Sequence, residues 1–382
     1  MTHAIPHPPR VLILSASTGN GHTSAARALE AVCRAEGLEV MVVDSLDYSP
    51  KAYRLWYAGG YEALVRWLPV VWGLLYRDSD SPKASFQMQT RLDVIFLKRL
   101  DALVHSFQPD WVLCTHSLPQ PRLALLKQRG KQFKMGIVIT DLHPHLMWLR
   151  GEPDVFFVPT DWSKQRLLER CPTTENRVVV TGIPVHPAFG VVESRQVARL
   201  TAKLKPDVPA VLVSAGGIGA GPFVEVIQLL QTIEAPLQVV VICGRNAGLR
   251  THIERTLSQK PPKDTLEITL TGHISLGEMA ALMRSADFMI GKPGGLTSSE
   301  CLVAGCPLVV YSPFMIPGQE EENARSLVDN GAGVVADNIQ DLGIVVKRLL
   351  ESPSERESLR RNALALSKPN ATAEIIQAIR ER

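Results

Sequence analysis

Twelve short apolar runs, each rich in Val, Ile and Leu, alternate with segments of helical periodicity along the 382 residues. Strands that are apolar throughout and separated by helices are typical of parallel sheets covered on both faces. Six runs fall in each half, so the sequence predicts an α/β protein with two Rossmann-like, doubly wound domains. The expected strands are 11–16, 39–43, 110–114, 135–139, 155–158 and 177–181, then 210–214, 238–243, 266–270, 287–290, 307–311 and 333–336.

The expected domain boundary lies at Pro184-Val185-His186-Pro187, where prolines interrupt both helix and strand. We expect an N-terminal domain at 1–187, a second domain at 188–360, and a C-terminal helix at 361–382 that packs back on the first. Ligands of parallel α/β sheets bind beyond the carboxyl ends of the strands. Two such domains facing each other would therefore place the reacting groups in a central cleft.

The bulk composition excludes several classes of protein. A net charge of +3 is too weak to indicate a nucleic-acid partner. The six cysteines form no CxxC pair, so we interpret them as reduced and expect a cytoplasmic protein. No run approaches the roughly 20 apolar residues of a membrane span, and the first ten residues do not resemble a signal peptide. We expect a protein that is soluble or lies on a membrane surface.

The loop Ser15-Ala-Ser-Thr-Gly-Asn-Gly-His22 follows the first expected strand and precedes a helical run. Its glycines allow a tight turn, and the helix start behind them favours negative charge. His22 could act there as a general base, with Asn20 on the acceptor side. A plain glycine turn with a capping histidine remains an equal alternative.

A second loop, Gly291-Lys-Pro-Gly-Gly-Leu-Thr-Ser-Ser-Glu300, also joins a strand end to a helix. Its glycines and hydroxyl residues, among them Gly294, Gly295 and Thr297, predict a nest for a diphosphate. Glu300, one turn later, could accept hydrogen bonds from a ribose diol. An ordinary capped helix is the alternative.

Two further segments follow strand ends of the second half. In Ile316–Ala324, the side chains of Gln319 and Glu320 could contact sugar hydroxyls, although an acidic helix start is normally solvated. The glycine-rich run 215–221, which includes Gly217, leaves room for a phosphate or for the facing domain. That signal is weak by itself.

Two polar patterns suggest metal binding, and we discount both. Thr140–His145 contains two histidines and an aspartate, but we find no third ligand at a useful spacing. We expect His143 to orient or bind the acceptor instead. Asp78-Ser79-Asp80 resembles a metal-binding DxD motif, but it lies in a polar loop and not at a strand end. We therefore expect no metal and no other cofactor.

An aromatic segment at 48–80 contains five of the six tyrosines and three of the six tryptophans, with arginines between them. Trp and Tyr prefer the membrane interface, and arginine binds anionic headgroups. The segment predicts a membrane anchor or an acyl-chain tunnel, with Trp56, Trp67 and Trp72 as contact residues. A helical hairpin packed on the first domain is the alternative.

Together these motifs resemble those of a glycosyltransferase family similar to family 28. That family contains plant-type monogalactosyldiacylglycerol synthases and bacterial processive diacylglycerol glucosyltransferases. The resemblance extends more distantly to the lipid-linked peptidoglycan-precursor N-acetylglucosaminyltransferase. It implies a GT-B fold, an acceptor bound mainly by the first domain, a UDP-sugar bound by the second, and inversion without a metal. In this family pattern, His22 matches the base. Gly294, Gly295 and Thr297 match the diphosphate loop, Glu300 the ribose contact, Gln319 and Glu320 the sugar contacts, and the backbone of Ile274 a uracil contact.

The resemblance implies transfer of galactose or glucose from a UDP-sugar to diacylglycerol or a related glycolipid, by a peripheral protein on the inner face of the membrane. The glycine run lacks an acidic residue that some galactolipid synthases place there, and 320–322 is unusually acidic, so the donor hexose stays open. Three alternatives remain: a transferase for another lipid-linked or soluble acceptor, an enzyme like UDP-N-acetylglucosamine 2-epimerase, and a lipid-binding protein without activity.

Overall fold

The computed structural model describes residues 8–81 and 85–382, which fold into two compact units. The first unit comprises Met1–Ala63, Leu75–His186 and Asn370–Arg382, and the second comprises Leu64–Leu74 and Pro187–Pro369. The chain therefore changes units at His186, beside the proline segment. Two features differ from the expected domains: Leu64–Leu74 groups with the second unit, and the return to the first unit starts at Asn370 instead of residue 361.

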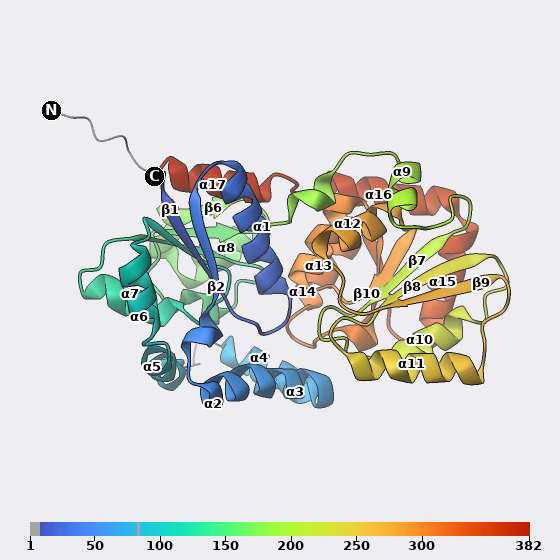
Figure 1. Cartoon of the computed structure of the whole chain (residues 1–382), viewed down its shortest axis with the longest axis horizontal. Helices are drawn as coiled ribbons and strands as arrows, with labels where there is room; N and C mark the ends of the chain where they lie inside the picture. Colours follow the sequence, from blue (N-terminus) through green and yellow to red (C-terminus); the bar gives the residue numbers. More distant parts are fainter. Residues whose placement is uncertain (1–7, 82–84) are drawn as a thin grey trace. The chain divides into compact units, whose positions relative to one another are not determined.

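Each unit contains one six-stranded parallel sheet with helices on both faces (Figure 1). The first sheet has the order β2-β1-β3-β4-β5-β6 and the second the order β12-β11-β10-β7-β8-β9. All twelve predicted strands form, with ends that differ by a few residues, because continuous apolar runs are buried on both sides of such sheets. The strands are β1 Arg10–Ser15, β2 Glu39–Asp44, β3 Trp111–Cys114, β4 Lys134–Val138, β5 Val155–Val158, β6 Val178–Val180, β7 Ala210–Ser214, β8 Leu237–Ile242, β9 Leu266–Thr271, β10 Phe288–Gly291, β11 Leu308–Tyr311 and β12 Gly333–Ala336.

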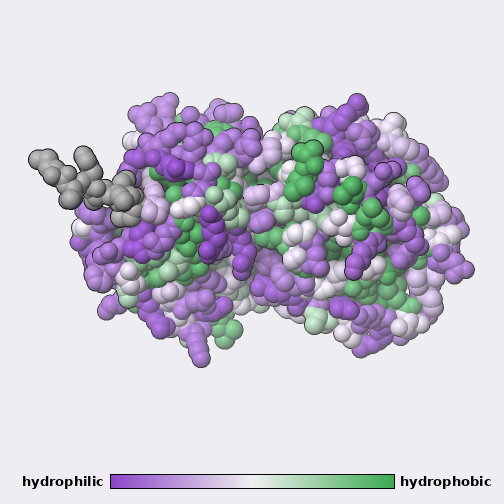
Figure 2. Space-filling model, turned by 45° about the horizontal axis from the view of Figure 1, so that its top comes forward, coloured by the Kyte–Doolittle hydropathy of each residue, from purple (hydrophilic) through white to green (hydrophobic). Residues whose placement is uncertain are grey.

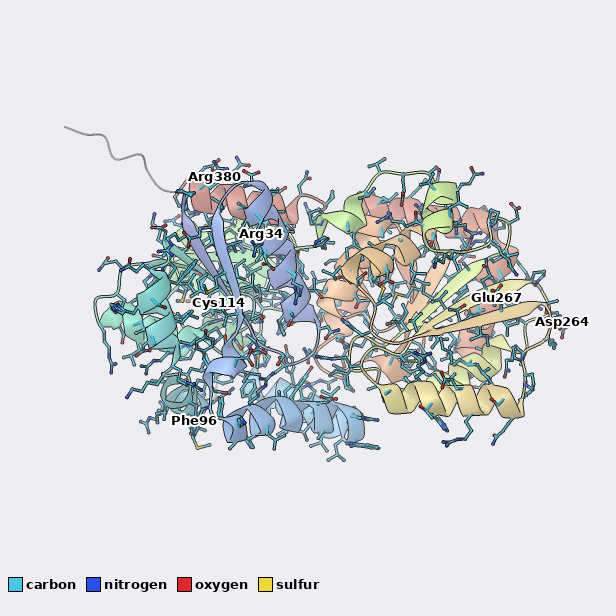
Figure 3. The ribbon with its side chains drawn as sticks, viewed as in Figure 1. Arg34, Phe96, Cys114, Asp264, Glu267 and Arg380 are labelled. Atoms are coloured by element: carbon cyan, nitrogen blue, oxygen red, sulfur yellow. The ribbon has the colours of Figure 1, made fainter. Side chains whose placement is uncertain are left out.

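Helices α1 and α17 pack together on one face of the first sheet (Figure 1). Buried residues of α1 (Gly21–Ala35) and of α17 (Ala371–Arg380) join one core with β1 and β3. Figure 3 labels Arg34 on α1 and Arg380 on α17, and Arg380 also pairs with Glu36 at 2.5 Å. The last helix is thus an integral layer of the first unit.

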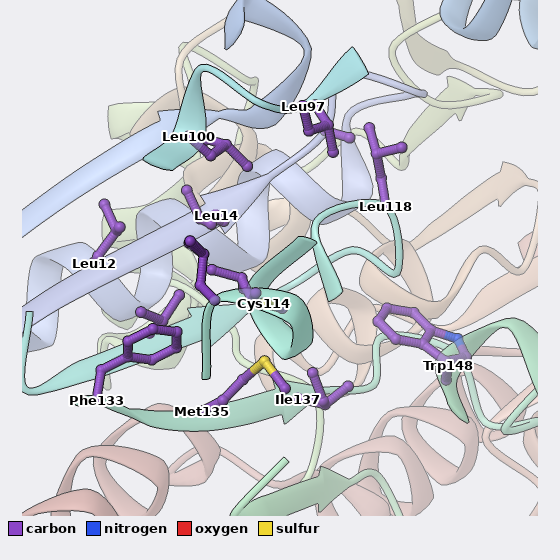
Figure 4. Close-up of a cluster of buried hydrophobic side chains, with 14 of the residues drawn as sticks. Leu12, Leu14, Leu97, Leu100, Cys114, Leu118, Phe133, Met135, Ile137 and Trp148 are labelled. Atoms are coloured by element: carbon purple, nitrogen blue, oxygen red, sulfur yellow. The ribbon is translucent and has the colours of Figure 1, made fainter. Parts of the chain in front are cut away.

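The opposite face of the first sheet is covered by a larger core (Figure 4). It combines strand residues such as Leu12 and Ile137 with Leu97, Leu100 and Trp148. The remaining helices of the first unit are α2 Lys51–Arg54, α5 Gln87–Phe96, α6 Leu100–Phe107, α7 Gln120–Gln128 and α8 Asp161–Arg170.

The second unit repeats this plan around its own core. Its helices are α9 Arg195–Thr201, α10 Phe223–Leu230, α11 Ala247–Gln259, α12 Leu276–Ser285, α13 Gly295–Ala304, α14 Glu321–Asp329, α15 Ile339–Glu351 and α16 Pro353–Leu366. The strand numbering changes direction between β1 and β3 in the first sheet, and between β7 and β10 in the second. In doubly wound sheets these are the points where ligands bind.

The aromatic segment forms α2, a π-helical turn at Leu55–Gly59, α3 (Gly60–Trp67) and α4 (Pro69–Ser79). Its aromatic residues range from buried to exposed. Tyr53 and Tyr76 are buried, whereas Trp56 and Trp67 are 62% and 72% exposed. The other exposed apolar residues of the segment are Leu55, Leu68, Val70, Val71, Leu74 and Leu75. The packed hairpin and the exposed anchor were predicted as alternatives, and the segment has features of both.

Apolar residues are also scattered among hydrophilic ones on the face displayed in Figure 2. Within residues 8–81 and 85–382, no helix is both long and apolar enough to cross a membrane.

Candidate active site

His22 lies in the first turn of α1, directly beyond the carboxyl end of β1. Gly19 has a φ of +99°, so it makes the turn that connects the strand to the helix. Asn20 precedes the helix, and its side chain does not cap the helix. The loop therefore presents the His22 imidazole at the point where the numbering of the first sheet changes direction.

The hydrogen bonds of His22 determine which ring nitrogen can accept a proton. Nδ1 lies 2.8 Å from the carbonyl oxygen of Thr115 and 3.0 Å from Oγ1 of Thr140. A carbonyl oxygen can only accept, so Nδ1 carries the hydrogen and Nε2 carries the lone pair. Thr115 Oγ1 also donates to the backbone oxygen of His22 at 2.9 Å. The contacts of Nδ1 orient the ring with Nε2 as the basic nitrogen, and the Thr115 hydroxyl fixes the backbone of His22 beside it.

Burial lowers the pKa of His22 to about 4, and the hydrogen bond to Thr115 only partly opposes this shift. The start of α1 also disfavours a positive charge on the ring. His22 is therefore neutral at physiological pH, the form that a general base requires.

A second histidine, His116, stands beside the first. The two rings meet edge to face, with centroids 4.5 Å apart. His116 Nδ1 accepts from the backbone N–H of Leu118 at 3.0 Å, so Nε2 carries the hydrogen and donates to Thr18 Oγ1 at 3.0 Å. Burial holds the pKa of His116 well below its usual value. His116 could not be predicted from the sequence, because only the pairing of β1 with β3 brings it to His22.

His143 takes part in an ion-pair network and not in a cluster of metal ligands. Its Nε2 lies 2.6 Å from Oδ2 of Asp80, which Arg170 also binds. Burial alone would raise the pKa of Asp80, but hydrogen bonds from His143, Arg170 and the Leu146 N–H outweigh it and hold that pKa well below its usual range. Within the described ranges, no group of three or more His, Cys, Asp or Glu side chains could hold a metal ion.

Three of the predicted donor motifs meet in the second unit, at the point between β7 and β10. A Cβ atom on Gly216 would lie 3.2 Å from Cε of Lys292, and one on Gly294 would lie 3.3 Å from Oε1 of Glu320. The glycines thus allow the three loops to approach one another. Gly294 precedes α13, whose N-terminus presents Gly295 and Thr297.

Glu320 is 3% exposed and forms an ion pair with Lys292. Its second oxygen accepts from the backbone N–H of Ile316 at 2.9 Å. Glu320 was predicted to contact the sugar, but both of its carboxylate oxygens bind groups of the protein. Lys292, which was not predicted as a site residue, places its Nζ 3.9 Å from the position of a Cβ atom on Gly294, the N-cap of α13.

Glu300 is buried in α13, and desolvation raises its pKa to about 8. In the ligand-free protein the carboxyl group is therefore mainly protonated at neutral pH. Ser298, in the same helix, has a buried hydroxyl with no hydrogen-bond partner among the described residues. This helix start accordingly holds polar groups whose hydrogen-bonding capacity the protein does not use.

The other predicted donor contacts lie in loops of the same unit. The carbonyl oxygen of Gly217 accepts from the N–H of Arg245 at 3.1 Å. Ile274 is half-buried and directly precedes Ser275, the N-cap of α12. Gln319 is half-buried, and its Oε1 accepts from the indole N–H of Trp72 at 3.3 Å.

Both halves of the chain match known families. Residues 22–185 match the family described as monogalactosyldiacylglycerol (MGDG) synthase. Residues 210–379 match the family described as the glycosyltransferase family 28 C-terminal domain. A processive diacylglycerol beta-glucosyltransferase of Bacillus licheniformis is 30% identical over 396 residues, which cover 97% of this chain and 94% of that protein.

The chain belongs to this family of glycosyltransferases. The resemblance inferred from the motifs is therefore confirmed, and the chain is a glycosyltransferase of the family 28 type. The match extends over nearly the whole of the relative, so both units are shared.

Solved structures with the same fold include MurG and a UDP-GlcNAc 2-epimerase. The structure is similar to MurG of Acinetobacter baumannii, with a TM-score of 0.61 and 17% identity over 98% of this chain and 100% of that one. It is equally similar to UDP-GlcNAc 2-epimerase of Neisseria meningitidis, with a TM-score of 0.62 and 15% identity over 98% and 100%. At these identities the likeness shows the fold alone. It confirms the predicted GT-B fold and does not favour an epimerase.

Proposed function

We propose that the protein transfers hexose, glucose or galactose, from a UDP-sugar to diacylglycerol or a related glycolipid, with inversion at the anomeric carbon. The observation that carries the reaction step is the hydrogen bond from His22 Nδ1 to the Thr115 carbonyl oxygen. It leaves the Nε2 lone pair of a neutral imidazole to accept a proton. The relatives that match over the whole chain are named for transfer of glucose to diacylglycerol, which supports the acceptor class.

In the proposed reaction, Nε2 of His22 takes the proton of the acceptor hydroxyl. The acceptor oxygen forms a bond to the anomeric carbon from the side opposite the diphosphate. The bond from that carbon to the phosphate oxygen breaks, and UDP leaves with the electron pair. Attack from the opposite side inverts the anomeric configuration.

We further propose that no metal is needed, because the protein supplies positive charge where UDP leaves. The first backbone N–H groups of a helix have no partner within the helix, and α13 starts after Gly294 without a side-chain cap, at the positive end of the helix dipole. Lys292 lies beside it. Preorganised donors of this kind stabilise developing negative charge without a cation.

The acceptor lies in a bilayer, so we propose that the protein binds the inner face of the membrane peripherally and prefers anionic lipids. The exposed tryptophans Trp56 and Trp67 and the exposed aliphatic residues of α4 support this. Aromatic rings of this kind partition to the headgroup region. Arg66, stacked on Trp67 at 5.1 Å, adds a positive charge that suits anionic headgroups.

The test is to incubate the full-length protein with UDP-glucose or UDP-galactose and vesicles with or without diacylglycerol. We expect UDP release that depends on diacylglycerol, and a glycolipid product whose mass and linkage identify the hexose and the inversion. UDP release that does not respond to diacylglycerol would contradict the lipid acceptor. Conversion of UDP-GlcNAc to its 2-epimer would support an epimerase instead.

A further inference from the structure

Helix α4 presents two different faces within the stretch Leu64–Leu74, which belongs to the second unit. Val70 and Leu74 are 68% and 62% exposed, whereas Gly73 is buried and Trp72 is half-buried. The exposed and the covered positions recur with the spacing of a helix turn. One face of the helix is therefore apolar and exposed to solvent, and the other face packs against the protein.

The covered face packs against the segment predicted to contact the donor sugar. A Cβ atom on Gly73 would lie 2.7 Å from the carbonyl oxygen of Pro317 and 2.9 Å from its Cβ, so the two backbones are in direct contact. One residue earlier, Trp72 Nε1 donates to Oε1 of Gln319 at 3.3 Å. A residue bulkier than glycine at position 73 would collide with Pro317 and prevent this close packing.

This hydrogen bond determines what Gln319 can offer to a ligand. An indole N–H can only donate, so it engages the amide oxygen of Gln319. The amide nitrogen, with its two hydrogens, is then the group left to donate to a sugar hydroxyl. Neighbouring Glu320 is held by Lys292 and by the N–H of Ile316. Gln319 is therefore the side chain of this pair that can turn toward a hexose.

We propose that Trp72 is a positioning residue for the donor sugar: it orients the Gln319 amide so that its nitrogen faces the hexose, and it makes helix α4 part of the sugar site. The inference rests on the proposed function, because it takes a UDP-hexose as the ligand. It assigns Trp72 a role different from that of Trp67, which is 72% exposed and stacks with Arg66.

The experiment measures the affinities of the full-length protein for UDP and for each UDP-hexose by calorimetry, without membranes. Trp72→Phe keeps an aromatic ring but removes the N–H donor, and Gly73→Ala pushes α4 away from Pro317. Trp162→Phe, at an exposed position of α8, is the matched control. Loss of one neutral hydrogen bond typically weakens binding by about threefold to tenfold. We expect that loss for the UDP-hexose in Trp72→Phe and Gly73→Ala, with unchanged affinity for UDP and no effect in the control.

A double-mutant cycle checks that Trp72 acts through Gln319. The double variant Trp72→Phe/Gln319→Ala should bind a UDP-hexose no more weakly than Gln319→Ala alone, because coupled residues are not additive. Additive losses, or equal losses for UDP and UDP-hexose, would overturn the inference and leave the proposed function intact. A wild-type protein that binds neither UDP nor a UDP-hexose would overturn both.

Discussion

The Nδ1 atom of His22 donates to the backbone carbonyl oxygen of Thr115 at 2.8 Å, across the junction of β1 and β3. A backbone acceptor cannot change its protonation state, so it holds one tautomer over the whole accessible pH range. A carboxylate in the same place would raise the pKa of the ring. With a backbone partner, the pKa of His22 stays low and the histidine stays neutral.

Replacement of His22 by Ala should lower kcat by about 10²–10⁴-fold, the usual cost of removing a general base. The affinity for UDP should stay within about twofold of the wild type, because the predicted UDP residues lie in the other unit. Initial rates with diacylglycerol vesicles, together with calorimetry of UDP binding, measure both effects. His105→Ala, at an exposed position of α6, is the control. Near-normal turnover of His22→Ala would eliminate the base assignment.

The pH dependence of the rate should report the lowered pKa of His22. The base is active when neutral, and its pKa is about 4 instead of 6.5. The value of kcat/KM should therefore stay flat as the pH falls from 7.5 to 5.5. The acid limb should appear only as the pH approaches about 4. A limb centred near pH 6.5 that disappears in His22→Ala would show that the ring is solvated and the burial argument incorrect.

Glu300→Gln should stabilise the ligand-free protein in a pH-dependent way. Burial raises the folded-state pKa of Glu300 to about 8, above its value of 4.5 in the unfolded chain. The folded state thus retains a proton that the unfolded state releases, and stability falls as the pH rises from 4.5 to 8, by up to about 1.4 kcal/mol per pH unit. Glutamine does not titrate, so the variant should gain free energy of unfolding over that range.

Urea unfolding at pH 5, 6, 7 and 8 measures this gain. The exposed Glu357→Gln in α16 is the control for the removal of one carboxylate at the surface. The same Glu300→Gln variant should bind UDP more weakly, since an amide accepts fewer hydrogen bonds from a ribose diol than a carboxylate. A stability difference that is constant with pH would show that Glu300 is already ionised.

The strands and the loops at their ends could be predicted because each depends on local sequence. An apolar run buried on both faces has no polar alternation, and a glycine turn before a helix has a characteristic composition. The pairs that join distant segments could not be predicted. His116 reaches His22 only because β3 pairs with β1, and Lys292 meets Glu320 only through the neighbouring strand ends.

The tryptophans illustrate the same limit within one segment. Composition predicted a common role for Trp67 and Trp72, but a composition cannot show which face of a helix is covered. Trp67 is 72% exposed, whereas Trp72 bonds to Gln319. The position of Gly73 next to Trp72 was the one available signal, since a glycine inside a helix often marks a close backbone approach.

Replacing Trp56 and Trp67 by Ser should reduce binding to anionic vesicles by about tenfold or more, because each exposed indole can bury a large apolar area at the interface. The affinity for UDP should not change. Co-sedimentation with vesicles measures the partition, and Trp162→Ser in α8 is the control. Equal partition of the double variant and the wild type would contradict membrane docking through these side chains.

Asp78 and Asp80 should differ sharply when each is replaced by Asn, although together they resemble a metal-binding motif. Asp80 pairs with Arg170 and His143, and its side chain is 14% exposed. Arg170 is 22% exposed, and the substitution removes the carboxylate that pairs with it. We therefore expect the free energy of unfolding to fall by about 3 kcal/mol. Asp78 is exposed, and its replacement should cost less than about 0.5 kcal/mol.

Activity with EDTA separates this structural role from a catalytic metal. If Asp80 holds only Arg170 and His143, EDTA should leave the wild-type rate unchanged, and added Mg²⁺ or Mn²⁺ should not raise it. Asp78→Asn should also keep full activity. A rate that EDTA abolishes and Mn²⁺ restores, together with a loss of activity in Asp78→Asn, would instead make the two aspartates metal ligands. The low pKa of Asp80 agrees with the first outcome, because its cause is the hydrogen bonds from His143, Arg170 and the Leu146 N–H.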